Sequence, residues 1–217
     1  AMVLNIAATA IDSSFAPWAY QKISEKKEKE VGKLAFTILI YTGMVCFFFA
    51  LFAPEFVYIL GGETYYQSIW VVPSVSMSVY FIMMYSLIST VAFYHEKTKA
   101  IMGASCLVAA LNIALNYYFI NLYGMLAAGY TTLACYVLYS LMHYILMLKI
   151  TKKEGINNPF NTFYIWGMAV IFVLLALLCT CIYKYTYIRI GLIIILAISG
   201  MFLYIKHKNK ISDYIKK

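Results

Sequence analysis

The sequence predicts an all-α protein, a polytopic bundle of transmembrane helices, and two observations lead to this prediction. Of the 217 residues, 64% are apolar and 12% are charged, whereas soluble domains have about 45–50% and about 25%. The apolar residues also gather into runs of about 20, the length that a helix needs to cross the hydrocarbon core. Because a water-soluble globule cannot bury so much apolar surface, the composition excludes a soluble enzyme, a disordered chain and a nucleic-acid-binding module.

Seven apolar segments are expected to form the bundle, six of them clear and one, at the N-terminus, partial. The last two are almost wholly apolar, as is typical of helices that face lipid. We therefore predict one transmembrane domain over 1–217, with a main bundle at about 1–150 and two peripheral helices at about 160–206. The six clear spans are 34–53, 68–93, 101–121, 124–148, 163–183 and 186–206, and the partial span is 2–20.

The positive charges alternate between successive loops, and this alternation predicts how the chain is threaded. Fifteen of the 17 Lys and Arg residues lie in the loops 21–33, 94–99 and 149–159 and in the C-terminal tail. The only exceptions are Lys184 and Arg189. Since short cytoplasmic loops carry the Lys/Arg excess, we expect the three basic loops and the C-terminus on the cytoplasmic side of the cell membrane. We interpret 21–33 as a solvated helix end, with binding of anionic lipid as the alternative.

Three of the spans carry polar side chains at helical spacing. Such a stripe must face another helix or a watery cavity, so we treat these side chains as candidate substrate or cavity contacts. For the two asparagines among them, the alternative is hydrogen bonding between helices. For the histidine, a place at the membrane interface is the alternative to a proton relay. The candidates are Ser74, Ser78, Tyr85, Ser89, Asn112, Asn116, Thr131, Tyr139 and His143.

Asp12 and Pro17 are the unusual residues of the N-terminal segment. Asp12 lies ten residues before Lys22, about 15 Å along a helix and near the middle of the bilayer if this segment spans it. An acid at that depth is costly. It indicates contact with a substrate, a cation or a proton, or else a structural contact or a segment that does not fully span. Pro17 removes a backbone hydrogen bond and is expected to kink the helix, as a hinge or simply as a matter of shape.

Motifs for catalysis and metal binding are not found in the sequence. His95 and Glu96 begin like a zinc-protease motif, but Lys99 stands where HExxH needs its second histidine. The five cysteines all fall inside predicted spans and form no CxxC pair, so we expect neither a disulfide framework nor a metal site. There is no P-loop and no GxSxG. We therefore expect no cofactor and no catalytic residue, and a protein that moves a substrate without transforming it.

Three stretches resemble one family. They are SFAPWAY at 14–20 with the Lys-rich loop after it, PEFVYILGGETY at 54–65, and NIALN at 112–116 followed by YGMLAAGYTT at 123–132. The third is the most specific. Together they are similar to the C-terminal lobe of the Wzx-type flippases of O-antigen and capsule repeat units, members of the MATE-like MOP superfamily.

The resemblance implies a fold. Such proteins have two pseudo-symmetric lobes of six helices around a central cavity, often with two further C-terminal helices. The chain would then hold helices eight to fourteen. The N-terminal lobe, with the charged cavity residues, would be missing from it.

The resemblance also implies a function: an undecaprenyl-pyrophosphate-linked oligosaccharide is turned from the inner to the outer leaflet of the bacterial inner membrane by alternating access. The implied partners are this lipid-linked substrate, membrane lipids, and a polysaccharide polymerase or export machinery. One alternative is a cation-coupled drug antiporter of the same fold, with Asp12 as the coupling site. Another is an integral-membrane glycan-processing enzyme, for which the loop 54–66 offers only Glu55 and Glu63 as acids.

Overall fold

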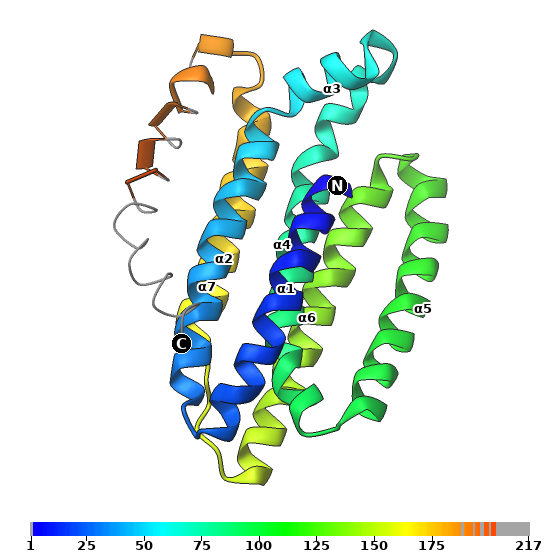
Figure 1. The fold of residues 1–217 in the computed structure, drawn as a ribbon. Helices are drawn as coiled ribbons and strands as arrows, with labels where there is room; N and C mark the ends of the chain where they lie inside the picture. Colours follow the sequence, from blue (N-terminus) through cyan, green and yellow to red (C-terminus); the bar gives the residue numbers. More distant parts are fainter. Residues whose placement is uncertain (1, 188, 193, 196–197, 200, 203–217) are drawn as a thin grey trace.

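The computed structural model describes residues 2–187, 189–192, 194–195, 198–199 and 201–202 (Figure 1). The regular structure within these residues is entirely helical, which confirms the all-α part of the predicted fold class. The elements are α1 (Met2–Ser24), α2 (Glu28–Leu51), α3 (Ala53–Gly61), η1 (Glu63–Trp70), α4 (Val72–Tyr94), α5 (Thr98–Tyr123), α6 (Ala127–Glu154), α7 (Thr162–Leu178) and η2 (Cys179–Ile182).

Five of the described helices are long and apolar enough to cross a membrane: α2, α4, α5, α6 and the stretch Thr162–Ile182, which joins α7 and η2. By length and composition the chain is therefore a multi-pass membrane protein. Helix α1 has 23 residues but is not one of these five, in line with its prediction as a partial span. The expected span 186–206 lies partly outside the described residues.

The observed helices extend beyond the predicted apolar runs. Helix α2 begins at Glu28, six residues before the expected start of its span, and α6 continues to Glu154, six residues beyond the expected end. Hydrophobicity marks only the part of a helix that lies in hydrocarbon. The charged turns at its ends remain helical, and the apolar pattern does not reveal them.

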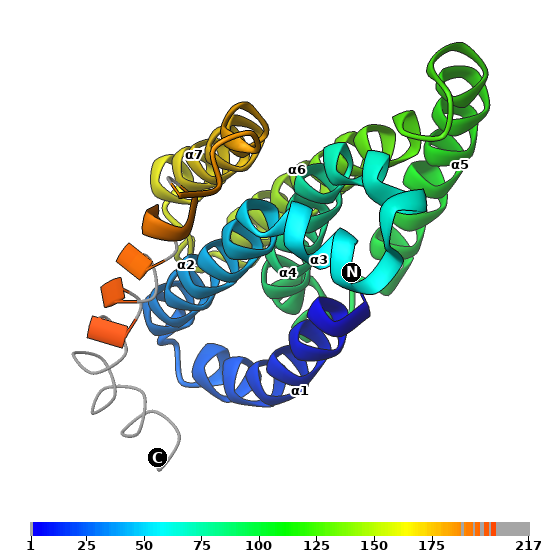
Figure 2. The same ribbon diagram turned by 90° about the horizontal axis from the view of Figure 1, so that it is seen from above.

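Helix α4 lies at the centre of the bundle. It contacts α1, α2, α5, α6 and α7, and most of its side chains are buried. Seen from above, α1, α2 and α6 surround it, α7 packs on the side of α2 that faces away from α1, and α5 lies beyond α6 (Figure 2). The polar stripe of α4 therefore faces other helices, as a stripe in a membrane must.

Small residues allow α4 and α6 to approach closely. A Cβ atom added at Gly129 would lie 2.3 Å from the Val71 side chain and 2.9 Å from the Ser74 hydroxyl oxygen. Farther along the same contact, the Ser140 hydroxyl donates a hydrogen bond of 2.9 Å to the Phe81 carbonyl. Close van der Waals packing and interhelical hydrogen bonds are what hold helices together in lipid.

The three basic loops lie at one end of the bundle, which we call the basic end. The connections from α1 to α2, from α4 to α5 and from α6 to α7 all lie there (Figure 1). The connection from α2 to α4, which contains α3 and η1, lies at the opposite end, as does the turn from α5 to α6. The fold therefore brings together the loops that the charge pattern assigns to one side. That this side is cytoplasmic stays a prediction.

Arg189 is one of the two exceptions to the charge pattern, and its charge is neutralised by Glu55. Both residues lie at the end of the bundle opposite the basic end. The Arg189 side chain is only 4% exposed, and Nη2 lies 2.7 Å from Oε1 of Glu55. A second hydrogen bond of 2.9 Å joins Nη1 to Oε2. The pair ties α3 to the segment after η2. Because Glu55 compensates the charge of Arg189, this residue does not count as an uncompensated positive charge at that end of the bundle.

Candidate functional site

A cavity of about 340 Å³ lies between α4, α5 and α6. It joins the three polar stripes, because Tyr85 comes from α4, Asn112 from α5 and Tyr139 from α6. This volume falls in the range of small-molecule sites, about 300–1,000 Å³. The remaining lining residues are Ser105, Val108, Ala109, Thr132, Cys135 and Tyr136.

Three aromatic rings form a cluster beside this cavity. Tyr139 and His143 are four residues apart on α6 and so share a face, with ring centroids 4.5 Å apart and planes nearly perpendicular. The ring of Tyr85 lies 4.3 Å from that of Tyr139 and 5.5 Å from that of His143. The Tyr139 hydroxyl also shares a hydrogen bond with the hydroxyl of Ser105 on α5. The cavity thus has an aromatic wall with a polar edge.

His143 is the most constrained polar side chain of the cluster. It is 1% exposed, and within the described residues neither ring nitrogen has a hydrogen-bond partner. The structure therefore places it inside the protein and not on its surface. A buried polar group without a partner costs free energy. A water molecule or a polar ligand group would supply the missing partner.

The two asparagines of α5 form a polar network with α6. The Asn116 side-chain amide donates to Oδ1 of Asn112 at 3.0 Å, and the Thr131 hydroxyl donates to Oδ1 of Asn116. The network therefore connects the two helices, as the interhelical alternative predicts. Asn112 also lines the cavity, and its own NH₂ group has no acceptor among the described residues. Asn112 therefore takes part in the polar network and also lines the cavity, so the two interpretations of this residue do not conflict.

The three serines of the α4 stripe are buried, and their hydroxyls are satisfied by their own helix. Ser74 donates to the Val71 carbonyl at 2.8 Å, Ser78 to that of Ser74 at 2.9 Å, and Ser89 to that of Ser86 at 2.8 Å. Serine in a helix commonly bonds a carbonyl one turn back. These residues do not line the cavity described above, and their role as substrate contacts stays a prediction.

Asp12 lies on α1 and is half-buried. Within the described residues it makes no hydrogen bond or ion pair, and it does not line the cavity described above. Helix α1 runs without a break through Pro17, which is exposed. The roles of Asp12 as a coupling site and of Pro17 as a hinge stay predictions.

Three polar or aromatic lining residues are not among the sequence candidates: Ser105 of α5, and Thr132 and Tyr136 of α6. The two α6 residues lie beside the row that contains Thr131 and Tyr139, and a helix face that contacts a cavity is wider than a single i,i+4 row. A search of both neighbouring rows for polar and aromatic residues would have found them.

Among the described residues, no group of three or more His, Cys, Asp or Glu side chains is placed to hold a metal ion. The cavity is lined by aromatic rings, hydroxyls and one amide, together with the apolar side chains of Val108 and Ala109 and the thiol of Cys135. Comparison of the chain with protein-family models, with curated proteins and with solved structures found no match.

Proposed function

We propose that this chain belongs to a transporter that carries lipid-linked oligosaccharides from the inner to the outer leaflet of a bacterial inner membrane. The observation that supports the proposal best is the cavity where Tyr85, Asn112 and Tyr139 meet. A sugar presents hydroxyl groups and apolar C–H faces. Amide and hydroxyl groups can hydrogen-bond the former, and tyrosine rings can cover the latter while keeping a polar tip. The resemblance of the sequence to Wzx-type flippases names the same class of substrate.

The physics of the task fits this arrangement. A sugar head group cannot cross about 30 Å of hydrocarbon without partners for its hydroxyls. Polar side chains between the helices can supply hydrogen-bond partners in place of the water that the sugar head group leaves behind. The lipid tail can stay outside, against exposed apolar side chains such as Ile113 of α5 and Leu174 of α7. The cavity lining carries no Lys or Arg, so the charges that would meet a pyrophosphate are expected in the N-terminal lobe that the resemblance implies.

The test is to substitute cavity residues in the full-length protein of the source cell. We expect Tyr139→Ala and Asn112→Leu to lower surface polysaccharide about tenfold, the effect of losing about 1.4 kcal/mol of substrate interaction. Lipid-linked oligosaccharide should accumulate in the inner leaflet. Tyr118→Ala is the matched control, because this tyrosine is 61% exposed and does not line the cavity. Unchanged polysaccharide at normal protein levels would contradict the proposal.

A second candidate, a cation-coupled antiporter of small molecules, is favoured by Asp12. A half-buried carboxylate on a helix that packs against the central helix α4 is suited to bind a cation or proton that drives transport. The discriminating assay is dye efflux from inverted vesicles under a sodium or proton gradient. Efflux that is lost in Asp12→Asn, together with unchanged surface polysaccharide, would favour the antiporter.

A further inference from the structure

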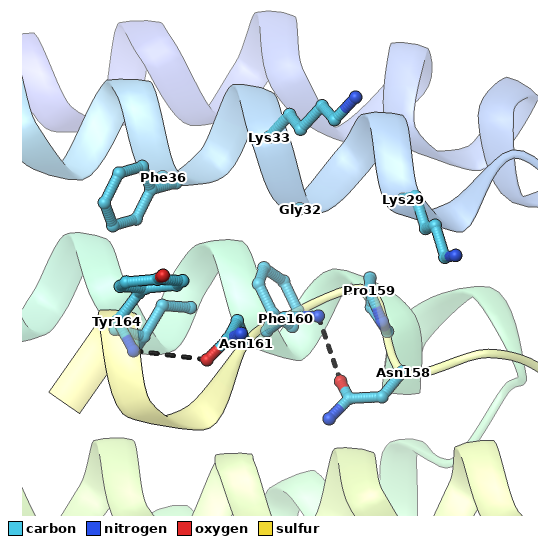
Figure 3. A pocket seen from close by; sticks show the side chains of 10 residues that line it. Lys29, Gly32, Lys33, Phe36, Asn158, Pro159, Phe160, Asn161 and Tyr164 are labelled. Carbon is cyan, nitrogen blue, oxygen red and sulfur yellow. Dashed lines mark hydrogen bonds between the residues drawn. The ribbon is translucent and has the colours of Figure 1, made fainter.

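A second pocket, of about 580 Å³, lies at the basic end, between the start of α2 and the segment that leads into α7 (Figure 3). The loop crosses directly over α2 at Gly32, where an added Cβ atom would lie 1.7 Å from the Pro159 carbonyl oxygen. Only glycine allows this approach. The lining residues are Lys29, Gly32, Lys33 and Phe36 of α2 and Asn158, Pro159, Phe160, Asn161, Tyr164 and Ile165.

The rim of this pocket is positively charged. Lys29 and Lys33 make no ion pair within the part of the chain that the structure describes, and the lining includes no acid. The neighbouring lysines differ, since Lys22 and Lys27 contact Glu25 at 3.2 and 2.9 Å. Their hydrogen bonds lower the pKa of that carboxyl to about 2. The charges of Lys29 and Lys33 thus remain available to an external anion.

Two asparagines add further donors. Asn158 accepts the backbone N–H of Phe160 at 3.0 Å, and Asn161, which caps α7, accepts those of Phe163 and Tyr164 at 3.1 and 3.3 Å (Figure 3). Because each amide oxygen is used in this way, each side chain has its NH₂ group left for an outside acceptor. Both lysines and both asparagines therefore offer donors.

The other wall of the pocket is apolar. Phe36 points toward Tyr164 in Figure 3, with ring centroids 6.3 Å apart in an edge-to-face arrangement. Phe160 and Ile165, which also line the pocket, are buried. Lys29 extends toward the loop on the other side of Gly32, whereas the Lys33 side chain points away from the loop in this view. A ligand in this pocket would thus meet positive charge at the helix ends and apolar rings toward the membrane-spanning part of α2 and α7.

We propose that this pocket binds the headgroup of an anionic phospholipid. Its phosphate lies against Lys29 and the asparagine NH₂ groups, Lys33 adds positive charge at the outer side of the rim, and one acyl chain lies against Phe36 and Tyr164. Basic pockets between transmembrane helices at the membrane surface have this chemistry. A free phosphate would use the rim alone. The proposal is independent of the substrate that the cavity between α4, α5 and α6 takes.

The test compares two lipids with the same acyl chains, phosphatidylglycerol and phosphatidylcholine, on the delipidated full chain in neutral detergent. Bound lipid is measured by native mass spectrometry. We expect phosphatidylglycerol to bind at least tenfold more tightly. Lys29→Gln with Lys33→Gln should weaken its binding about 25-fold, the loss of two surface lysines at about fivefold each. Binding of phosphatidylcholine should not change.

The control removes two other lysines from the same end of the molecule. Lys152 and Lys153 are exposed in the last turn of α6 and do not line the pocket, so Lys152→Gln with Lys153→Gln should leave the affinity as it is. If the Lys152 and Lys153 changes weakened the binding of phosphatidylglycerol as much as the Lys29 and Lys33 changes, the effect would be one of non-specific charge, and the proposal would be overturned. Displacement of phosphatidylglycerol by millimolar inorganic phosphate, or no response to the Lys29 and Lys33 changes, would overturn it as well. An unchanged thermal unfolding midpoint confirms that each variant is folded.

Discussion

Gly155 ends α6 in the left-handed backbone conformation, with φ +65°, and the same turn recurs at the ends of α1 and α4. There the left-handed residues are Lys26 and Glu96, with φ +58° and +55°. In each turn the next N–H reaches back five residues, as in the bond of 2.9 Å from Lys27 to the Lys22 carbonyl. This is Schellman geometry. All three turns lie at the basic end, where the chain must reverse within a few residues.

At the residue scale, we predict that Gly155→Ala lowers the free energy of unfolding by about 1 kcal/mol, since a Cβ atom disfavours positive φ. The cost is purely one of backbone conformation, because nothing lies within 4 Å of the added Cβ. Gly167 is the matched control, because it is helical in α7 and equally open. Gly167→Ala should therefore be stabilising, by about 1 kcal/mol at most. Thermal unfolding in detergent measures both, and shifts of the same sign would contradict the argument.

At the scale of the elements, the contact between α4 and α6 is set by Gly129. A Cβ atom there would lie 2.3 Å from the Val71 side chain, so Gly129→Ala should separate the helices or force a side chain from its rotamer. We expect a loss of about 1–3 kcal/mol, the usual cost of overpacking. Gly103→Ala on α5 is the control, because its Cβ would meet nothing within 4 Å.

A double variant sharpens this prediction. Val71→Ala removes the atom that the new Cβ would strike, so Gly129→Ala combined with Val71→Ala should be more stable than the sum of the two single losses. Residues in direct contact show such coupling, whereas distant ones add. Simple additivity in thermal unfolding would show that the two side chains do not meet.

The helices could be predicted from the sequence, whereas the composition of the site could be predicted only in part. A span requires a local property, about 20 apolar residues, and so α2, α4, α5 and α6 were expected near their observed positions. Tyr139, a member of the α6 stripe, lines the cavity, and its contact with a substrate stays a prediction. The α4 serines show the limit of this reasoning, because a hydroxyl can bond its own helix or face a cavity with the same spacing. Only the packing of neighbouring helices distinguishes the two.

At the scale of the whole molecule, the distribution of charge and the direction of the helices agree. Three connections that are rich in lysine lie at one end of the bundle. At the other end, the buried pair of Arg189 and Glu55 removes one of the two charges that break the pattern. Positive loops stay on the cytoplasmic side during insertion, so a bundle with one basic end has a preferred orientation.

This orientation can be tested by labelling single cysteines, after the five native ones have been replaced. Lys27→Cys, Lys97→Cys and Asn157→Cys lie in the three connections of the basic end. Tyr65→Cys and Met125→Cys lie at the opposite end, where the native side chains are 63% and 83% exposed. We expect a membrane-impermeant maleimide to label only the latter two in intact cells, and all five after permeabilisation. If the three basic-end positions were labelled from different sides, the chain would not cross the bilayer as the bundle requires. Both pockets would then lose the membrane setting on which their proposed ligands depend.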